Sequence, residues 1–342
     1  MPRISVVIPT HNRPGLLREA VASIQNQTFP DWEIVIVDDG SQPPVDAESL
    51  RKDFGSRIQV VRNEQPLKQP YARNQGVQAA TGDVVVHLDD DDLLAPEALE
   101  MSLATLESDP SLELVYLGVQ GFGKRAAHFD ESQKQAMQAV LSRAKGLETQ
   151  SGVIRFGPEL FAALLYSVPM AFQRSIEYRK TWNKVSALRR RAYMRDPDIA
   201  DEEQAMRRLR PPLRESEWAL YAAACSNTAL LLEPVYLQRC ETQGYFSVAS
   251  QRERAVLSRI DIKAHLLEAT NGIADLGHWG GEIRRSLGSA YFDQSYFYFQ
   301  NGRRFPAYRA LFNALKTHPA ASYLKFGVRM LLPRGSVPDQ VS

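Results

Sequence analysis

The stretch that decides the fold is residues 4–41, ISVVIPTHNRPGLLREAVASIQNQTFPDWEIVIVDDGS. Its two uncharged runs, Ile4–Ile8 and Ile34–Val37, are rich in β-branched residues and predict strands. Between them, after Pro14, apolar residues recur at helical spacing: Leu16, Leu17, Ala20, Val21 and Ile24. Strands that are apolar along their whole length are buried on both faces, so the pattern predicts a doubly wound parallel sheet with helices on both sides.

Two more strands, Ile58–Val61 and Val84–Leu88, extend this pattern, with helices predicted near residues 47–54, 71–80 and 96–106. Ligands bind such sheets beyond the carboxyl ends of the strands. Polar residues follow three of the four strands: residues 10–13, 38–39 and 89–92. We therefore expect these three segments to meet in one crevice.

The composition and the absence of certain motifs exclude several classes of protein. The chain has 342 residues, 44% of them hydrophobic, and a formal net charge of +1, which suits one large globular domain or two. Its two cysteines have no zinc-site spacing, and no apolar run is long enough to cross a bilayer, so we expect a cytoplasmic protein without a transmembrane helix. Neither a P-loop nor a dinucleotide fingerprint is present, and no nucleic-acid-binding motif accompanies the charge.

Four consecutive carboxylates stand in the stretch HLDDDDLLAP, residues 87–96. A calcium loop would need glycine where Leu94 stands, which argues against that motif. Carboxylates two apart suit Mg²⁺ or Mn²⁺, ions usually held together with substrate phosphates. The alternative is a solvated loop whose charge is favourable beside the N-terminus of the next helix.

The stretch of residues 4–41, followed by YARNQGVQAATGDVVVHLDDDDLLAPEAL at 71–99, resembles family 2 glycosyltransferases of the GT-A fold. The motifs follow the family's order over residues 3–100. The resemblance implies a GT-A doubly wound, mostly parallel sheet. It also implies an inverting, metal-dependent enzyme that moves a sugar from a nucleotide sugar, with UDP-sugar the expected donor, to a glycan or lipid-linked acceptor in surface polysaccharide synthesis.

The resemblance also implies roles for individual residues. The nucleotide-binding positions of the family fall on Pro9, Thr10, His11, Asp39, Arg73 and Asp90. The resemblance implies that Asp91 binds the metal, Mg²⁺ or Mn²⁺, most directly and that Asp89 contributes to the same site. Asp92 is the expected bystander.

The general base of the family lies in the second half of the domain, beside a tryptophan. The stretch LRESEWALYAAACSNTALLLEPVYLQRC, residues 213–240, fits that frame with Trp218 as the tryptophan. Glu217 is then the predicted base and Glu215 its rival. Because Ser216-Glu217 stands where Glu-Asp is usual, the alternative function is a catalytically silent GT-A module that binds a nucleotide or partner without turnover.

We expect a catalytic domain over residues 1–250, with a nucleotide and metal half at 1–110 and an acceptor half at 111–250. In the acceptor half, the block Arg189-Arg190-Arg191 either touches an anionic acceptor or forms a solvated helix face. A helical region should fill residues 251–342, including a hairpin over 286–319. In its second helix the apolar residues Tyr308, Leu311, Phe312 and Leu315 recur at helical spacing, and Pro319 should end it.

The C-terminal tail is basic and amphipathic. Residues 294–338 contain seven Lys and Arg and no acid, and residues 322–335 set Leu324, Val328 and Leu331 against Lys325 and Arg329. Such a tail either lies on an anionic membrane or packs onto the catalytic domain. The first alternative would suit a lipid-linked acceptor and a peripheral location on the inner face of the cell membrane.

Overall fold

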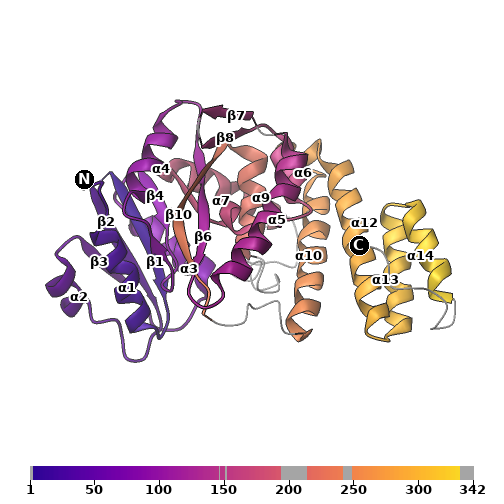
Figure 1. The fold of residues 1–342 in the computed structure, drawn as a ribbon, viewed down its shortest axis with the longest axis horizontal. Helices are drawn as coiled ribbons and strands as arrows, with labels where there is room; N and C mark the ends of the chain where they lie inside the picture. Colours follow the sequence, from indigo (N-terminus) through magenta and orange to yellow (C-terminus); the bar gives the residue numbers. More distant parts are fainter. Residues whose placement is uncertain (1–2, 146, 151, 194–213, 242–248, 332–342) are drawn as a thin grey trace. The chain divides into compact units, whose positions relative to one another are not determined.

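The structure is a computed structural model that describes residues 3–145, 147–150, 152–193, 214–241 and 249–331 (Figure 1). The chain divides into two compact units. Unit 1 comprises residues 1–189 and 215–244, and unit 2 comprises residues 190–214 and 245–342.

The first half of unit 1 is the predicted parallel sheet. Strand β1 (Ile4–Thr10) lies between β2 (Trp32–Asp39) and β4 (Val84–His87), and β3 (Ile58–Asn63) lies outside β2. All of these pairings are parallel. The helices that follow the strands are α1 (Pro14–Gln25), α2 (Ala47–Phe54), α3 (Gln69–Ala79) and α4 (Ala98–Glu107). These elements confirm the strands and helices predicted for this region.

The second half of the sheet is mixed. Strand β9 (Ser175–Tyr178) runs antiparallel between β4 and β6 (Leu114–Phe122), and β10 (Thr228–Arg239) is parallel to β6. Antiparallel partners of β10 complete it: β5 (Leu93–Leu94) and β8 (Val153–Phe156), the latter paired with β7 (Leu147–Gln150). The predicted α/β class is confirmed, and the insertion of β9 is a feature that the apolar pattern did not predict.

Helices cover the sheet on both sides, as Figure 1 shows. Alternate residues of the strands, such as Ile4, Val6 and Ile8, pack with α1 and α4 in one core. Besides α1–α4, the described part of unit 1 contains α5 (Ala126–Ala144), α6 (Glu159–Leu164), the 3₁₀ turn η1 (Met170–Gln173), most of α7 (Arg179–Tyr193) and α9 (Arg214–Cys225). The covering helices leave the carboxyl ends of β1, β2 and β4 at one common edge of the sheet, because these strands are parallel.

Unit 2 is helical in its described residues: α10 (Ala249–Ala269), α11 (Ala274–Gly277), α12 (Gly280–Gln300), α13 (Arg304–Thr317) and α14 (Ala321–Leu331). Helices α12 and α13 form the predicted hairpin. Of the apolar residues at helical spacing in α13, Leu311 is buried, whereas Tyr308 and Phe312 are exposed, and the rest of the buried face consists of Ala307, Ala310 and Ala314. Small alanine side chains let α13 approach α12 closely, and the Ser295 hydroxyl donates to the Ala307 carbonyl at 2.8 Å.

None of the helices that the structure describes is both long enough and apolar enough to cross a membrane.

Candidate active site

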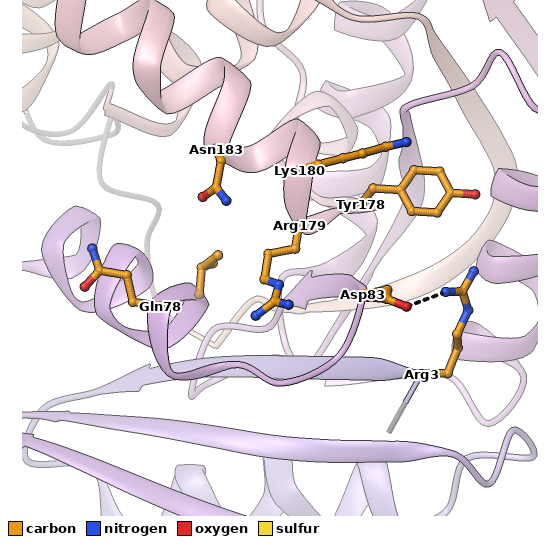
Figure 2. A pocket seen from close by; sticks show the side chains of 8 residues that line it. Arg3, Gln78, Asp83, Tyr178, Arg179, Lys180 and Asn183 are labelled. Carbon is orange, nitrogen blue, oxygen red and sulfur yellow. Dashed lines mark hydrogen bonds and ion pairs between the residues drawn. The ribbon is translucent and has the colours of Figure 1, made fainter. Parts of the chain in front are cut away.

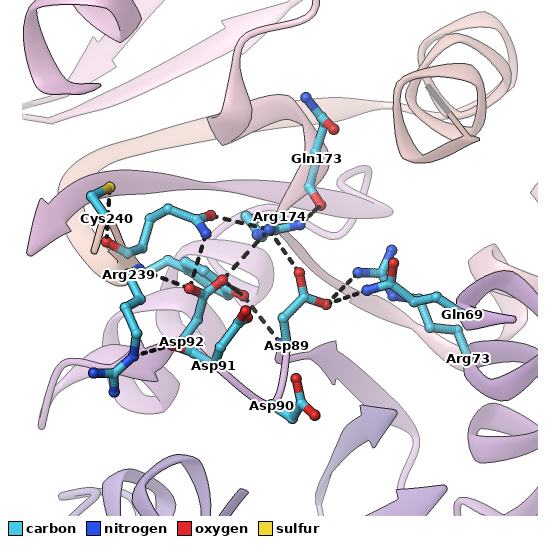
Figure 3. Close-up of polar contacts among 12 residues, drawn as sticks. Gln69, Arg73, Asp89, Asp90, Asp91, Asp92, Gln173, Arg174, Arg239 and Cys240 are labelled. Atoms are coloured by element: carbon cyan, nitrogen blue, oxygen red, sulfur yellow. Dashed lines mark hydrogen bonds and ion pairs between the residues drawn. The ribbon is translucent and has the colours of Figure 1, made fainter. Parts of the chain in front are cut away.

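The four aspartates lie in a tight turn after β4, at the carboxyl edge of the sheet (Figure 3). The Asp92 N–H donates to the Asp89 carbonyl at 3.1 Å and closes the turn. Four arginines from distant segments contact the turn: Arg13, Arg73, Arg174 and Arg239. The mutual repulsion of the carboxylates is therefore offset by cations that the fold brings to them.

Asp89 is held on both sides by guanidinium groups. Its Oδ1 accepts from the Gln69 amide and from Arg73 Nη2, each at 2.7 Å, and its Oδ2 accepts from Arg174 Nη2 at 2.8 Å. Burial alone would raise the pKa of Asp89, but Arg174 and Arg73 hold that pKa well below its usual range. Asp89 is thus kept ionised and fixed in orientation.

Asp90 and Asp91 share one arginine. Arg13 Nη1 lies 3.1 Å from Asp90 Oδ1 and 2.8 Å from Asp91 Oδ2. Asp90 also accepts from the Thr10 hydroxyl at 2.7 Å, which joins the ends of β1 and β4 as predicted. The side chain of Asp90 is 8% exposed and that of Asp91 is 35% exposed, so Asp91 offers the more accessible carboxylate.

Asp92, predicted to be a bystander, is instead buried and fully engaged. Its Oδ2 accepts from the Tyr236 hydroxyl at 2.9 Å, and its Oδ1 accepts from the Gln238 amide at 2.9 Å and the Arg239 N–H at 2.8 Å. Burial raises the pKa of Asp92 to about 7. Asp92 therefore anchors the acidic turn to β10.

A divalent cation fits this donor set. One carboxylate oxygen from each of Asp89, Asp91 and Asp92 lies within 4.8 Å of the others. Hard oxygen ligands of this kind suit Mg²⁺ or Mn²⁺. Among the described residues Arg13 is the one ion-pair partner of Asp91, so a cation there would compete with a single guanidinium.

The residues predicted to bind the nucleotide gather beside the turn. Pro9 and Thr10 end β1, and the exposed His11 places its Nδ1 2.8 Å from the Asp39 carbonyl oxygen. The carboxylate of Asp39 accepts from the Asn63 amide at 2.9 Å and from the N–H groups of Leu67 and Lys68 at 2.8 Å. In this structure Asp39 thus fixes the segment that leads into α3.

The predicted general base is buried. Glu217, in α9, is 0% exposed, and its Oε2 lies 2.9 Å from Arg189 Nε. A solvated face, one of the two alternatives for the arginine block, is therefore wrong for Arg189. The neighbouring Trp218 stacks on Trp182 at 4.9 Å. The side chain of the rival Glu215 lies outside the described part of the structure.

Trp182 connects the predicted base to the acidic turn, because its ring also lies 4.3 Å from that of His87. His87 ends β4, two residues before Asp89. An aromatic stack therefore runs from α9 to the strand that carries the aspartates.

Sequence reasoning missed five residues that contact the aspartates directly: Gln69, Arg174, Tyr236, Gln238 and Arg239. Arg174 precedes β9, and nothing local in the sequence indicates that this strand inserts beside β4. Tyr236 and Arg239 lie in β10, 144 and 148 residues beyond the aspartates that they contact, and no local pattern in the sequence links them to the turn.

A cavity of about 570 Å³ lies at the opposite, amino edge of the sheet (Figure 2). Its charged groups already have partners: Arg3 pairs with Asp83 at 3.3 Å, and Arg179 donates to the Ala80 carbonyl at 2.6 Å. Lys180 lies 5.0 Å from the ring centre of Tyr178. The carboxyl edge with its acidic turn therefore remains the candidate active site.

Known proteins resemble this chain in sequence and in fold. Residues 5–151 match the family model described as Glycosyl transferase family 2. A curated relative, GalNAc(5)-diNAcBac-PP-undecaprenol beta-1,3-glucosyltransferase of Campylobacter jejuni, is 42% identical over 102 residues. That match covers 29% of this chain and 33% of the relative, so the chain spans about a third of the relative's length.

Two solved structures share the fold. S. aureus TarS 1-349 in complex with UDP-GlcNAc superposes with a TM-score of 0.54 and 18% identity, over 93% of this chain and 82% of that one. Mannosyltransferase PcManGT from Pyrobaculum calidifontis, in complex with GDP-Man and Mn2+, gives a TM-score of 0.50 and 17% identity, over 97% and 81% of the two chains. Residues 5–151 are therefore similar to glycosyl transferase family 2, and the chain has the GT-A fold.

Proposed function

We propose that this protein is an inverting, metal-dependent glycosyltransferase that moves a sugar from a UDP-sugar to a glycan or lipid-linked acceptor in surface polysaccharide synthesis. The observation that carries the proposal is the acidic turn at the carboxyl edge of the sheet, where Asp91 is accessible and Thr10 joins the end of β1 to Asp90. Known proteins support the substrate classes: the name of the Campylobacter jejuni relative refers to PP-undecaprenol, and the two solved structures are complexes with UDP-GlcNAc and with GDP-Man and Mn2+.

Asp91 and Asp89 are the proposed holders of Mg²⁺ or Mn²⁺. When bound, the ion supplies Lewis-acid stabilisation of the diphosphate leaving group. Asp90 would hold the ribose, with Thr10 fixing its orientation through their 2.7 Å hydrogen bond. Pro9, His11 and Asp39 would lie along the base, and Arg73 would add positive charge near the diphosphate.

Inversion requires a base on the face of the sugar opposite the diphosphate, within hydrogen-bond reach of the acceptor hydroxyl. We assign this role to Glu217, with Glu215 as its rival. Because Arg189 Nε lies 2.9 Å from Glu217 Oε2 and both side chains are buried, Glu217 can accept a proton only if this pair separates when the acceptor binds.

The buried Glu217–Arg189 pair is also the observation that favours the second candidate function, a silent GT-A module. A carboxylate that stays sealed in an ion pair cannot accept a proton from an acceptor, whereas nucleotide binding at the acidic turn would be unaffected.

The test is the release of UDP from a panel of UDP-sugars with Mn²⁺ and candidate acceptors, alongside calorimetric binding of UDP. The enzyme proposal predicts turnover that Glu217→Gln reduces at least a hundredfold while UDP binding is retained. Asp31→Asn, at an exposed aspartate of the amino edge, serves as the control. UDP binding without turnover for any donor and acceptor would favour the silent module.

A lipid-linked acceptor would also determine where in the cell the protein acts. The proposal places the protein in the cytoplasm, in peripheral contact with the inner face of the cell membrane, because the acceptor would lie in that surface.

A further inference from the structure

Large apolar side chains are exposed together on the last two helices of unit 2. Six of them, 36% to 80% exposed, are Phe305, Tyr308, Phe312, Leu324, Val328 and Leu331. Of the other described residues, only Leu232 in unit 1 and Tyr296 in α12 are large, apolar and exposed. Exposed apolar residues scattered singly need no explanation, but a cluster of six marks an interaction site.

The six residues form two adjacent stripes. In α13 they recur at i, i+3 and i+7, and in α14 at i, i+4 and i+7, so each set lies along one side of its helix. The Tyr308 hydroxyl donates to the Met330 carbonyl at 3.0 Å, which places the α13 stripe beside the end of the α14 stripe.

Both stripes point away from α12. The residues that face α12 are others: Ala307 accepts from Ser295, and Tyr323 and Phe326 have ring centres 4.6 and 5.2 Å from that of Phe292. The side-by-side packing of α13 and α14 is visible in Figure 1. The six side chains therefore make one continuous surface, which we call the apolar surface.

Positive charge flanks this apolar surface. The exposed cations of α13 and α14 are Arg304, Arg309, Lys316, Lys325 and Arg329, and none of them forms an ion pair with another residue that the structure describes. No acid occurs between residues 294 and 338. Apolar residues bordered by unpaired cations are typical of helices that lie in the headgroup region of anionic membranes.

We propose that the apolar surface of α13 and α14 docks on an anionic lipid surface, with the flanking cations among the headgroups. This deepens the proposed function, since it rests on the membrane contact proposed there and assigns it to named residues. A second copy of the chain is the less suitable occupant. A symmetric contact through this surface would bring its own uncompensated cations together.

The test is co-sedimentation of the full chain with vesicles of phosphatidylcholine alone or with one quarter phosphatidylglycerol. We expect at least tenfold stronger binding to the anionic vesicles, weakened by salt. Phe312→Ser with Val328→Ser, and separately Lys325→Glu with Arg329→Glu, should each reduce binding at least tenfold. The matched controls in unit 1, Leu232→Ser and Lys134→Glu, should bind as the unchanged protein does.

Circular dichroism would verify that each variant is folded. The inference is overturned if the unchanged protein does not bind anionic vesicles, or if both double variants bind normally. It is also overturned if light scattering shows a dimer that Phe312→Ser dissociates while vesicle binding persists. Vesicle binding without any sugar transfer would contradict only the proposed function, and transfer to a soluble acceptor without vesicle binding would contradict only this inference.

Discussion

The Tyr236 hydroxyl lies between Asp92 and Asp89. It donates to Asp92 Oδ2 at 2.9 Å and accepts from the Asp89 N–H at 3.2 Å, so one side chain of β10 sets the position of both ends of the acidic turn. Replacing Tyr236 by phenylalanine would leave two buried polar groups without this partner.

We therefore expect Tyr236→Phe to lower the free energy of unfolding by about 1–3 kcal/mol and to weaken Mn²⁺ binding. Denaturant titration and Mn²⁺ calorimetry measure the two effects. Tyr178→Phe, at the amino edge, is the control and should change neither. Unchanged Mn²⁺ affinity in Tyr236→Phe would show that the turn does not depend on this hydroxyl.

Arg174 joins the second half of the sheet to the acidic turn. It contacts Asp89 at 2.8 Å and the Gln238 amide oxygen at 3.1 Å, and its guanidinium carbon lies 4.9 Å from the ring centre of Tyr236. Removing one partner of a buried ion pair leaves the other charge uncompensated, so Arg174→Met should cost about 3–5 kcal/mol of stability.

The matched control for Arg174→Met is Arg18→Met, which breaks the exposed Arg18–Asp53 pair and should cost about 0–1 kcal/mol. Thermal denaturation compares the two variants. Equal losses would mean that Arg174 acts as an ordinary surface cation.

Lys263 gives unit 2 a dependence on pH. Burial, with a smaller contribution from Arg259, lowers the pKa of Lys263 to about 7, and its amine lies 3.3 Å from the Ser286 carbonyl oxygen. The unfolded chain, with the ordinary lysine pKa near 10.5, binds more protons than the folded chain between pH 7 and 10.5. The contribution of Lys263 to stability therefore rises with pH across that window.

Lys263→Met should accordingly raise the melting temperature of unit 2 at pH 7 and flatten its change between pH 7 and 10. Lys134→Met, at an exposed lysine of unit 1, should keep the pH profile of the unchanged protein. A profile for Lys263→Met that matches the unchanged protein would contradict the lowered pKa.

Much of the site could be predicted because its residues directly follow strands that the sequence marks clearly. Thr10, Asp39 and Asp89 each come at the end of an apolar run, and parallel strands bring such ends to one edge. The contact of Arg174 with Asp89 and the burial of Asp92 could not be predicted this way. They depend on partners beside or within β9 and β10 that lie 85 and 144 residues further along the chain. The exposure of Phe312 could not be predicted either, since helical spacing alone does not show that alanines, and not Phe312, pack on α12.

The central claim is that Asp91 holds the cation of a sugar-transferring site. Its most direct test is Mn²⁺-dependent release of UDP from a UDP-sugar, compared between the unchanged protein and Asp91→Ala. The account predicts that chelating the metal and replacing Asp91 each reduce turnover at least a hundredfold, and that Asp31→Ala does not. Full turnover in Asp91→Ala, or turnover that is indifferent to Mn²⁺, would contradict it.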